Sequence, residues 1–175
     1  MLESKAWYIK MAITMQTKPE IEMTDELYQL SPAQAQEVLA AFLKTEREEF
    51  PKLAIGAIEL DYSLQSVADA LKHITTEVEA GHLDEEQRNV WFMRLGYYFG
   101  EALIQSNSGL SWGLGNPEYA FANHPVIVGF AGSEEAPMIT ICKNLVDAVA
   151  EGISPISRIS NAVNSWFGTA VETSE

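Results

Sequence analysis

Residues 64–78 carry an apolar stripe at helical spacing, and this stripe limits the possible folds more than any other feature. Its members are Leu64, Val67, Leu71, Ile74 and Val78. Steps of three and four residues place these side chains on one face of an α-helix, which must be buried against another element. The pattern predicts a helix that follows the turn at residues 61–63 and ends near Gly81, where a glycine suits a helix C-terminus.

A second helix has a strong start signal at Ser31-Pro32-Ala33-Gln34. Ser31 can accept a hydrogen bond from the backbone of Gln34, and the glutamine side chain can reach back to Ser31. Pro32 loses no helical hydrogen bond at the first position. We expect this helix to stop near Phe50, because Pro51 disfavours helical geometry in the residue before it.

A third helix is predicted from Asp84, with Gln87 as its capping partner, to the Asn107 region. It contains Gly96 and Gly100, one turn apart. Each glycine costs about 1 kcal/mol relative to alanine in a helix interior. Their presence indicates that another element packs closely against this face.

The remaining segments have shorter patterns. Residues 7–15 alternate between apolar and other side chains and predict an N-terminal strand, followed by an acidic connector up to residue 30. After Gly109, short apolar runs between turn signals predict strands of an antiparallel or mixed sheet. These runs are Ser111–Leu114, Tyr119–Ala122, Val126–Phe130 and Met138–Cys142. Two C-terminal helices are expected, a short one at 144–151 and one from Ser154-Pro155 with Ile156, Ile159, Val163 and Phe167 on its face.

Strands and helices are therefore segregated along the chain, which predicts an α+β fold. The length of 175 residues suits a single domain, 1–175. We divide it into a strand with its connector (1–30), a helical part (31–109), a strand part (110–142) and C-terminal helices (143–170).

The charge of the chain is strongly negative. Asp and Glu total 25 against 11 Lys and Arg, which gives a net charge of −14. Such a surface repels nucleic-acid phosphates and anionic lipids, so we expect neither nucleic-acid nor membrane binding. Two interpretations of the charge stay open: solubility, or electrostatic attraction of a basic protein partner.

The expected location is the cytoplasm. Cys142 is the single cysteine, so no intramolecular disulfide can form. The N-terminus lacks the pattern of a signal peptide, since Glu3 stands where positive charge belongs. No run of about 18 apolar residues indicates a membrane span.

Catalytic and metal-binding signatures are absent from the sequence. His73, His82 and His124 have no metal-ligand spacing, and neither a nucleophile elbow nor a phosphate-binding loop occurs. We therefore expect no metal, no cofactor and no catalytic residue. Acidic pairs that could perform acid–base chemistry are Glu59 with Asp61 and Glu101 with Glu118. In a chain with 25 acidic residues such pairs arise by chance.

Candidate partner-binding residues lie near the expected ends of the strands: Trp112, Glu118, Tyr119, Glu134 and Glu135. An aromatic residue in a glycine-rich stretch beside acidic residues is typical of an interface, where Trp and Tyr dominate the binding energy. The alternative, which we favour for Trp112, is a side chain folded back over the edge of the sheet.

Two stretches also carry a family resemblance. Leu60–Val67 opens a helix, and Gly96–Glu101 is followed by Trp112 and by apolar runs around Val126 and Met138. This layout, over residues 58–145, resembles small, largely uncharacterised bacterial proteins, some of which look like immunity proteins of polymorphic toxin systems. The resemblance implies a bacterial protein that binds a toxin domain, and it brings no catalytic residues with it.

Three functions are compatible with these features. The first is a non-catalytic antagonist, such as an immunity protein, that binds a basic toxin domain. The second is a secretion chaperone or adaptor, which requires an exposed apolar groove or a homodimer face. The third is an enzyme that uses carboxylates in a cleft. We rank them in that order, and a homodimer stays open under each.

Overall fold

The computed structural model describes residues 27–118, 120–131 and 134–172. The N-terminal strand expected at residues 7–15 lies outside them. The elements are α3 (Pro32–Glu49), the 3-10 helix η1 (Phe50–Lys52), α4 (Leu64–Glu79), α5 (Glu85–Ser106), β1 (Ser111–Leu114), β2 (Pro125–Val128), α6 (Met138–Ala150) and α7 (Ser157–Glu172). The described chain is mixed α+β and mostly helical, with one two-stranded antiparallel sheet.

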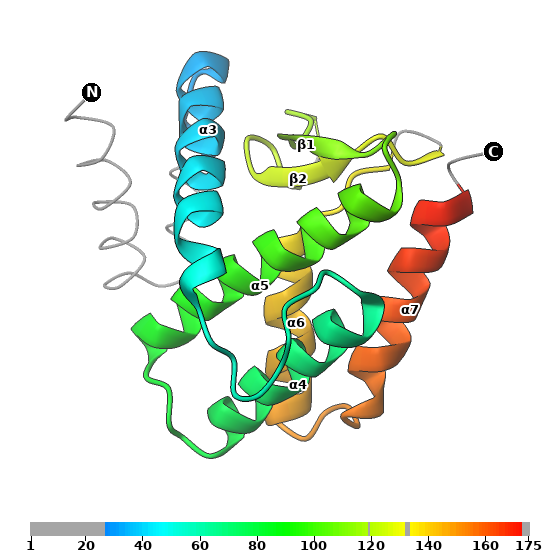
Figure 1. Ribbon diagram of the computed structural model, residues 1–175. Helices are drawn as coiled ribbons and strands as arrows, with labels where there is room; N and C mark the ends of the chain where they lie inside the picture. Colours follow the sequence, from blue (N-terminus) through cyan, green and yellow to red (C-terminus); the bar gives the residue numbers. More distant parts are fainter. Residues whose placement is uncertain (1–26, 119, 132–133, 173–175) are drawn as a thin grey trace.

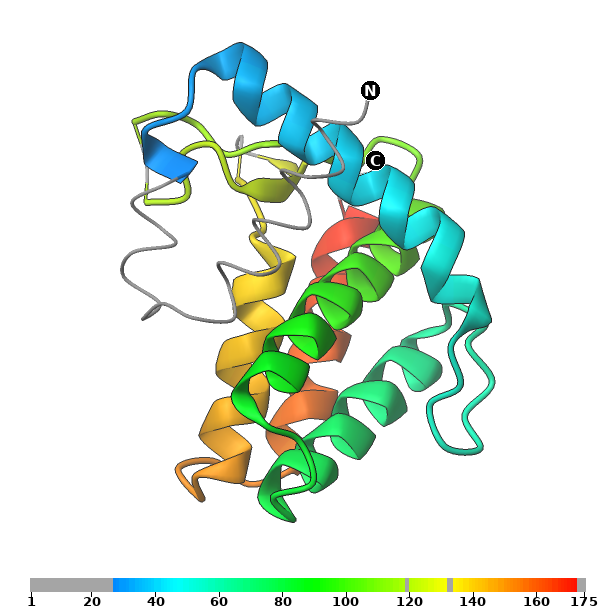
Figure 2. The ribbon, with the colours of Figure 1, turned by 90° about the vertical axis from the view of Figure 1, so that its left-hand side faces the viewer.

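The four helices α4, α5, α6 and α7 pack together as one group (Figure 1). The hairpin β1–β2 lies at one end of this group, and α3 runs across the same end beside the hairpin (Figure 2). The core is formed where these helices meet, and Tyr98, Phe99 and Leu71 are completely buried in it. None of the helices in the described residues is long and apolar enough to cross a bilayer.

The capping box predicted for α3 is present. The backbone N–H of Gln34 donates to Ser31 Oγ at 3.3 Å, and Ser31 N–H donates to Gln34 Oε1 at 3.0 Å. The helix ends at its C-cap Phe50, directly before Pro51, as the sequence predicts. It buries one face, formed by Ala35, Val38, Leu39, Phe42 and Glu46.

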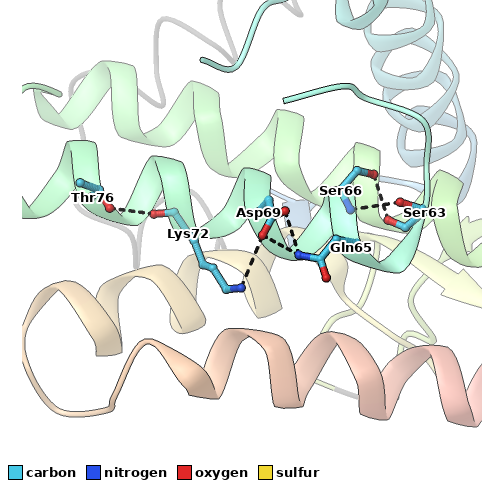
Figure 3. A network of polar contacts seen from close by, with 6 residues as sticks. All are labelled: Ser63, Gln65, Ser66, Asp69, Lys72 and Thr76. Atoms are coloured by element: carbon cyan, nitrogen blue, oxygen red, sulfur yellow. Dashed lines mark hydrogen bonds and ion pairs between the residues drawn. The ribbon is translucent and has the colours of Figure 1, made fainter. Parts of the chain in front are cut away.

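The stripe of α4 is buried as predicted, with Val67, Leu71 and Ile74 at most 2% exposed. Ser63 caps the helix by accepting from the backbone N–H of Ser66 at 3.1 Å. Several polar contacts lie along the same helix (Figure 3). They include Gln65 to Asp69 at 2.8 Å, Lys72 to Asp69 at 3.5 Å, and the Thr76 hydroxyl to the Lys72 carbonyl at 3.1 Å.

The two glycines of α5 are sites of close packing, as their position in the helix predicts. A Cβ at Gly96 would stand 2.6 Å from the Cα of Ile139, on α6. A Cβ at Gly100 would stand 2.3 Å from the ring of Trp112, on β1. Two neighbouring elements therefore approach the backbone of α5 one turn apart.

Of the four strands predicted after Gly109, two form within the described residues. Trp112 pairs with Ile127 in the antiparallel ladder of β1 and β2, and Ile127 also forms an isolated bridge with Ala136. In the run at 119–122, Ala122 forms a single bridge with Gly115 and residues 120–121 are a turn.

The strand predicted at Met138–Cys142 is wrong, because these residues form the first turns of α6. The buried positions of α6 are Met138, Cys142, Leu145, Val146 and Val149, spaced as on one helix face. A short apolar run does not by itself distinguish a strand from a buried helix. The strand part therefore ends before residue 138, and the short helix predicted at 144–151 begins six residues earlier.

The last helix is close to its prediction. α7 buries Ile159 and Val163 completely, and Phe167 is half-buried. Ile156 is wrongly assigned to the buried face: it precedes the helix and is 45% exposed.

Candidate functional site

The side chain of the candidate residue Trp112 packs against α5 and forms a hydrogen bond to it. Its indole N–H donates to Oε1 of Glu101 at 2.9 Å, and its ring lies against Gly100. The ring is parallel to that of Tyr97, with 6.4 Å between centroids, and meets Phe42 edge-on at 5.9 Å. The side chain is half-buried, and its ring lies against α5, so part of its surface stays available to a partner.

Glu101 lies where α3, α5 and β1 meet. Besides the indole of Trp112, Arg47 of α3 approaches Oε1 with its Nη2 at 3.9 Å, and the carboxylate side chain is 18% exposed. Burial, together with the negative charge of Glu101, raises the pKa of Tyr97 to about 12. The same two causes raise the pKa of Tyr62. Both phenols are protonated at neutral pH, so this cluster links three elements and offers no phenolate base.

In each of the two carboxylate pairs proposed from the sequence, one member has another hydrogen-bond partner. Glu101 binds Trp112, whereas Glu118 lies exposed on the turn after β1. Asp61 accepts the backbone N–H of Ser63 at 2.9 Å, and hydrogen bonds from Ser63 lower its pKa to about 2. Because a general acid needs a pKa near the working pH, Asp61 is poorly suited to that role at neutral pH.

The two loops at the far end of the hairpin are tied together. Both oxygens of the Glu135 carboxylate accept the backbone N–H of Asn116 at 3.0 Å. The Asn116 side chain in turn accepts the backbone N–H of Glu118 at 2.9 Å. The exposed carboxylates of Glu118 and Glu134 therefore stand on adjoining loops. Tyr119, the fifth candidate, lies outside the described residues.

An open groove of about 480 Å³ lies between α3 and Trp112. Its lining is apolar at Leu39, Ala40, Leu43 and Trp112 and polar at Gln36, Lys44, Arg47 and Glu48. The volume falls within the usual range of ligand pockets, although an open groove buries less of a bound molecule. The sequence did not indicate this groove, because it depends on where β1 lies relative to α3.

A contact between residues 27–30 and the loop before β2 was also missed. The side-chain amide of Asn123 donates to the carbonyls of Leu27 at 2.9 Å and Leu30 at 3.1 Å. The Tyr28 hydroxyl donates to the carbonyl of Ala120. The Tyr28 ring also lies 5.7 Å from the ring of His124. Asn123-His124-Pro125 is a turn signal in the sequence, and nothing in the sequence pairs it with residues 27–30.

The remaining reactive groups lie apart. Cys142 is completely buried on α6, and burial raises the pKa of its thiol. His82 pairs with Glu77 at 3.1 Å, and burial lowers the pKa of His124. Within the described residues, no group of three or more His, Cys, Asp or Glu side chains is placed to hold a metal ion.

Comparison with known proteins gives no relative. No protein-family model, no curated protein and no solved structure matches the chain.

Proposed function

We propose that this chain is a non-catalytic antagonist that binds a basic protein domain, in the manner of an immunity protein that neutralises a toxin. The observation that carries the proposal is the pair of adjoining acidic loops at the hairpin end, which hold Glu118 and Glu134 exposed. The family resemblance of residues 58–145 points to the same class.

The charges on these loops are available to a partner. Among the described residues, no lysine or arginine forms an ion pair with Glu118, Glu134 or Glu135. The net charge of −14 adds a long-range field of the same sign. Complementary charge accelerates encounter and selects against acidic partners, which is the behaviour that a fast antagonist of a basic toxin needs.

Hydrogen bonds at Asn116 make the proposed surface more effective. The bonds from Asn116 to Glu135 and from Glu118 to Asn116 hold the backbone before a partner arrives. Less conformational freedom is then lost on binding, which favours affinity. We assign contact roles to Glu118 and Glu134, to Tyr119, and to the exposed part of Trp112 on the strand that leads into this turn. Glu135 acts by positioning Asn116.

Affinity capture from the native cell tests the proposal with two double variants of equal charge change. Glu118→Lys with Glu134→Lys alters the hairpin end. Glu79→Lys with Glu151→Lys alters exposed acids at the ends of α4 and α6, away from the hairpin, and serves as control. We expect the wild type and the control to retain a basic protein at low salt and the hairpin-end variant to lose it.

Growth of cells that express the captured protein separates antagonism from mere binding. We expect the captured protein to be toxic alone and harmless with the wild-type chain, and the hairpin-end variant to fail to protect. A captured protein that is not toxic, or protection by the hairpin-end variant, would contradict the proposal.

The groove beside α3 favours a second candidate, a secretion chaperone or adaptor. Leu39, Leu43 and Trp112 supply the larger apolar residues of this open groove, and a segment of a client protein would bind against them. A chaperone is expected to raise the soluble yield of its client and to bind it through the groove at high salt. Substitution of Leu43 by Asp would then abolish capture, whereas reversal of Glu118 and Glu134 would not.

A further inference from the structure

One side of α3 is covered by neither the helix group nor the hairpin. Five residues on this side are exposed and follow one another at steps of four and three: Ala33, Glu37, Ala40, Lys44 and Arg47. Three of them, Ala40, Lys44 and Arg47, also line the groove beside Trp112. This spacing places the five side chains in a line along one side of the helix. We call these five residues the outer face of α3.

The charges on the outer face of one copy are complementary to those on the same face of a second, antiparallel copy. Glu37 lies three residues before Ala40, and Lys44 lies four residues after it. Neither charge takes part in an ion pair within the part of the chain that the structure describes. A second α3 running in the opposite direction would place Lys44 of one copy opposite Glu37 of the other.

We propose that the outer face of α3 binds a second copy of this chain, with the two α3 helices antiparallel. A two-fold axis between Ala40 and Ala41 then pairs Glu37 with Lys44 twice, since the same patch is used by both copies. The small side chain of Ala40 allows the helix axes to approach to about 8 Å at the crossing. This inference uses a surface other than the hairpin end, so it goes beyond the proposed function and does not depend on it.

The apolar residues that line the groove beside Trp112 give this contact its hydrophobic part. In the antiparallel arrangement, Leu43 of the second copy lies at the level of residue 38 of the first. It is then close to Gln36, Leu39 and Ala40, which line the groove. From Ala33 to Arg47 the outer face is about 21 Å long, at 1.5 Å per residue. A contact of this length is small, so we expect a reversible dimer with a dissociation constant on the order of 10–100 µM.

Sedimentation equilibrium over a range of concentrations tests the dimer directly. We expect the wild type to pass from monomer to twice the monomer mass as concentration rises. Glu37→Lys should weaken the association by about tenfold, because lysine at 37 then faces lysine at 44. Adding Lys44→Glu to the same chain should restore it, since the opposite charges have been exchanged within each pair.

Glu79→Lys is the matched control, because it makes the same charge change away from α3. Loss of negative charge reduces the general repulsion between two chains of −14, so this variant should associate at least as well as the wild type. A wild type that stays monomeric up to about 1 mM would overturn the proposal. Equal behaviour of Glu37→Lys and Glu79→Lys, or a double exchange that fails to restore association, would overturn it as well.

Discussion

The indole N–H of Trp112 donates a 2.9 Å hydrogen bond to Oε1 of Glu101, and this bond joins β1 to α5. Glu101 directly follows Gly100, whose missing side chain leaves the space that the tryptophan ring fills. One turn of α5 therefore supplies both the room for the ring and the acceptor for its polar atom. This pair places the hairpin on the helix group, and with it the acidic loops at the far end of the hairpin.

Removal of the Glu101 carboxylate should weaken this junction. Glu101→Ala leaves the indole N–H of Trp112 without its acceptor, and we expect a loss of about 1–3 kcal/mol in the free energy of unfolding. Glu101→Gln keeps an oxygen acceptor and should cost less. Arg47 is 61% exposed and 3.9 Å away, so its contribution is small. Urea denaturation measures all of these changes, and an Ala variant as stable as the Gln variant would show that the bond contributes nothing.

Alanine at Gly100 should destabilise the protein although alanine is the better helix former. Its Cβ would stand 2.3 Å from the ring of Trp112, and overpacking of this kind costs about 1–3 kcal/mol. Gly168 on α7 is the control, since a Cβ there meets nothing within 4 Å. We expect Gly168→Ala to raise the free energy of unfolding by up to about 1 kcal/mol. Thermal unfolding midpoints that move the same way for both variants would contradict this packing.

Local signals predicted the helices well, and non-local contacts account for what was missed. The caps at Ser31 and Asp84 form between residues near in sequence. The glycine at position 96 indicated close packing, but its neighbour Ile139 is distant in the sequence. The strand prediction for Met138–Cys142 is wrong because five residues are too few to show a helical period. The period becomes visible only when the buried residues of the later turns of α6 are included. Two of the candidate residues, Glu118 and Glu135, are brought together by Asn116, and no sequence pattern pairs Asn116 with Glu135.

The free energy of unfolding should fall as the pH drops through the range in which His124 is protonated in the unfolded chain. Burial lowers the pKa of this residue in the folded state below 6.5. The unfolded chain therefore takes up a proton near pH 6.5 that the folded chain does not, and stability is lost below that pH. His124→Phe keeps an aromatic ring between Tyr28 and Phe121 and removes the titration. We expect a smaller loss of stability between pH 7 and pH 5 in this variant, measured by urea denaturation. Identical pH profiles for the variant and the wild type would contradict the assignment.

The thiol of Cys142 should be inert in the folded protein. It is completely buried in α6, and burial raises its pKa, so the reactive thiolate is scarce at neutral pH. We expect an aromatic disulfide reagent to react with one thiol per chain in urea and with none in the native state on the same time scale. Rapid reaction of the native protein would show that α6 opens or that the thiol is accessible.

The rate of association with the captured basic partner, measured by stopped-flow fluorescence at low and moderate salt, tests the central claim most directly. We expect the wild-type rate constant to fall as salt rises, because salt screens the attraction between unlike charges. At low salt, reversal of Glu118 and Glu134 should slow association by about tenfold or more, and reversal of Glu79 and Glu151 should slow it much less. Equal slowing by the two pairs, or a wild-type rate that does not change with salt, would contradict the assignment of the hairpin end as the binding surface.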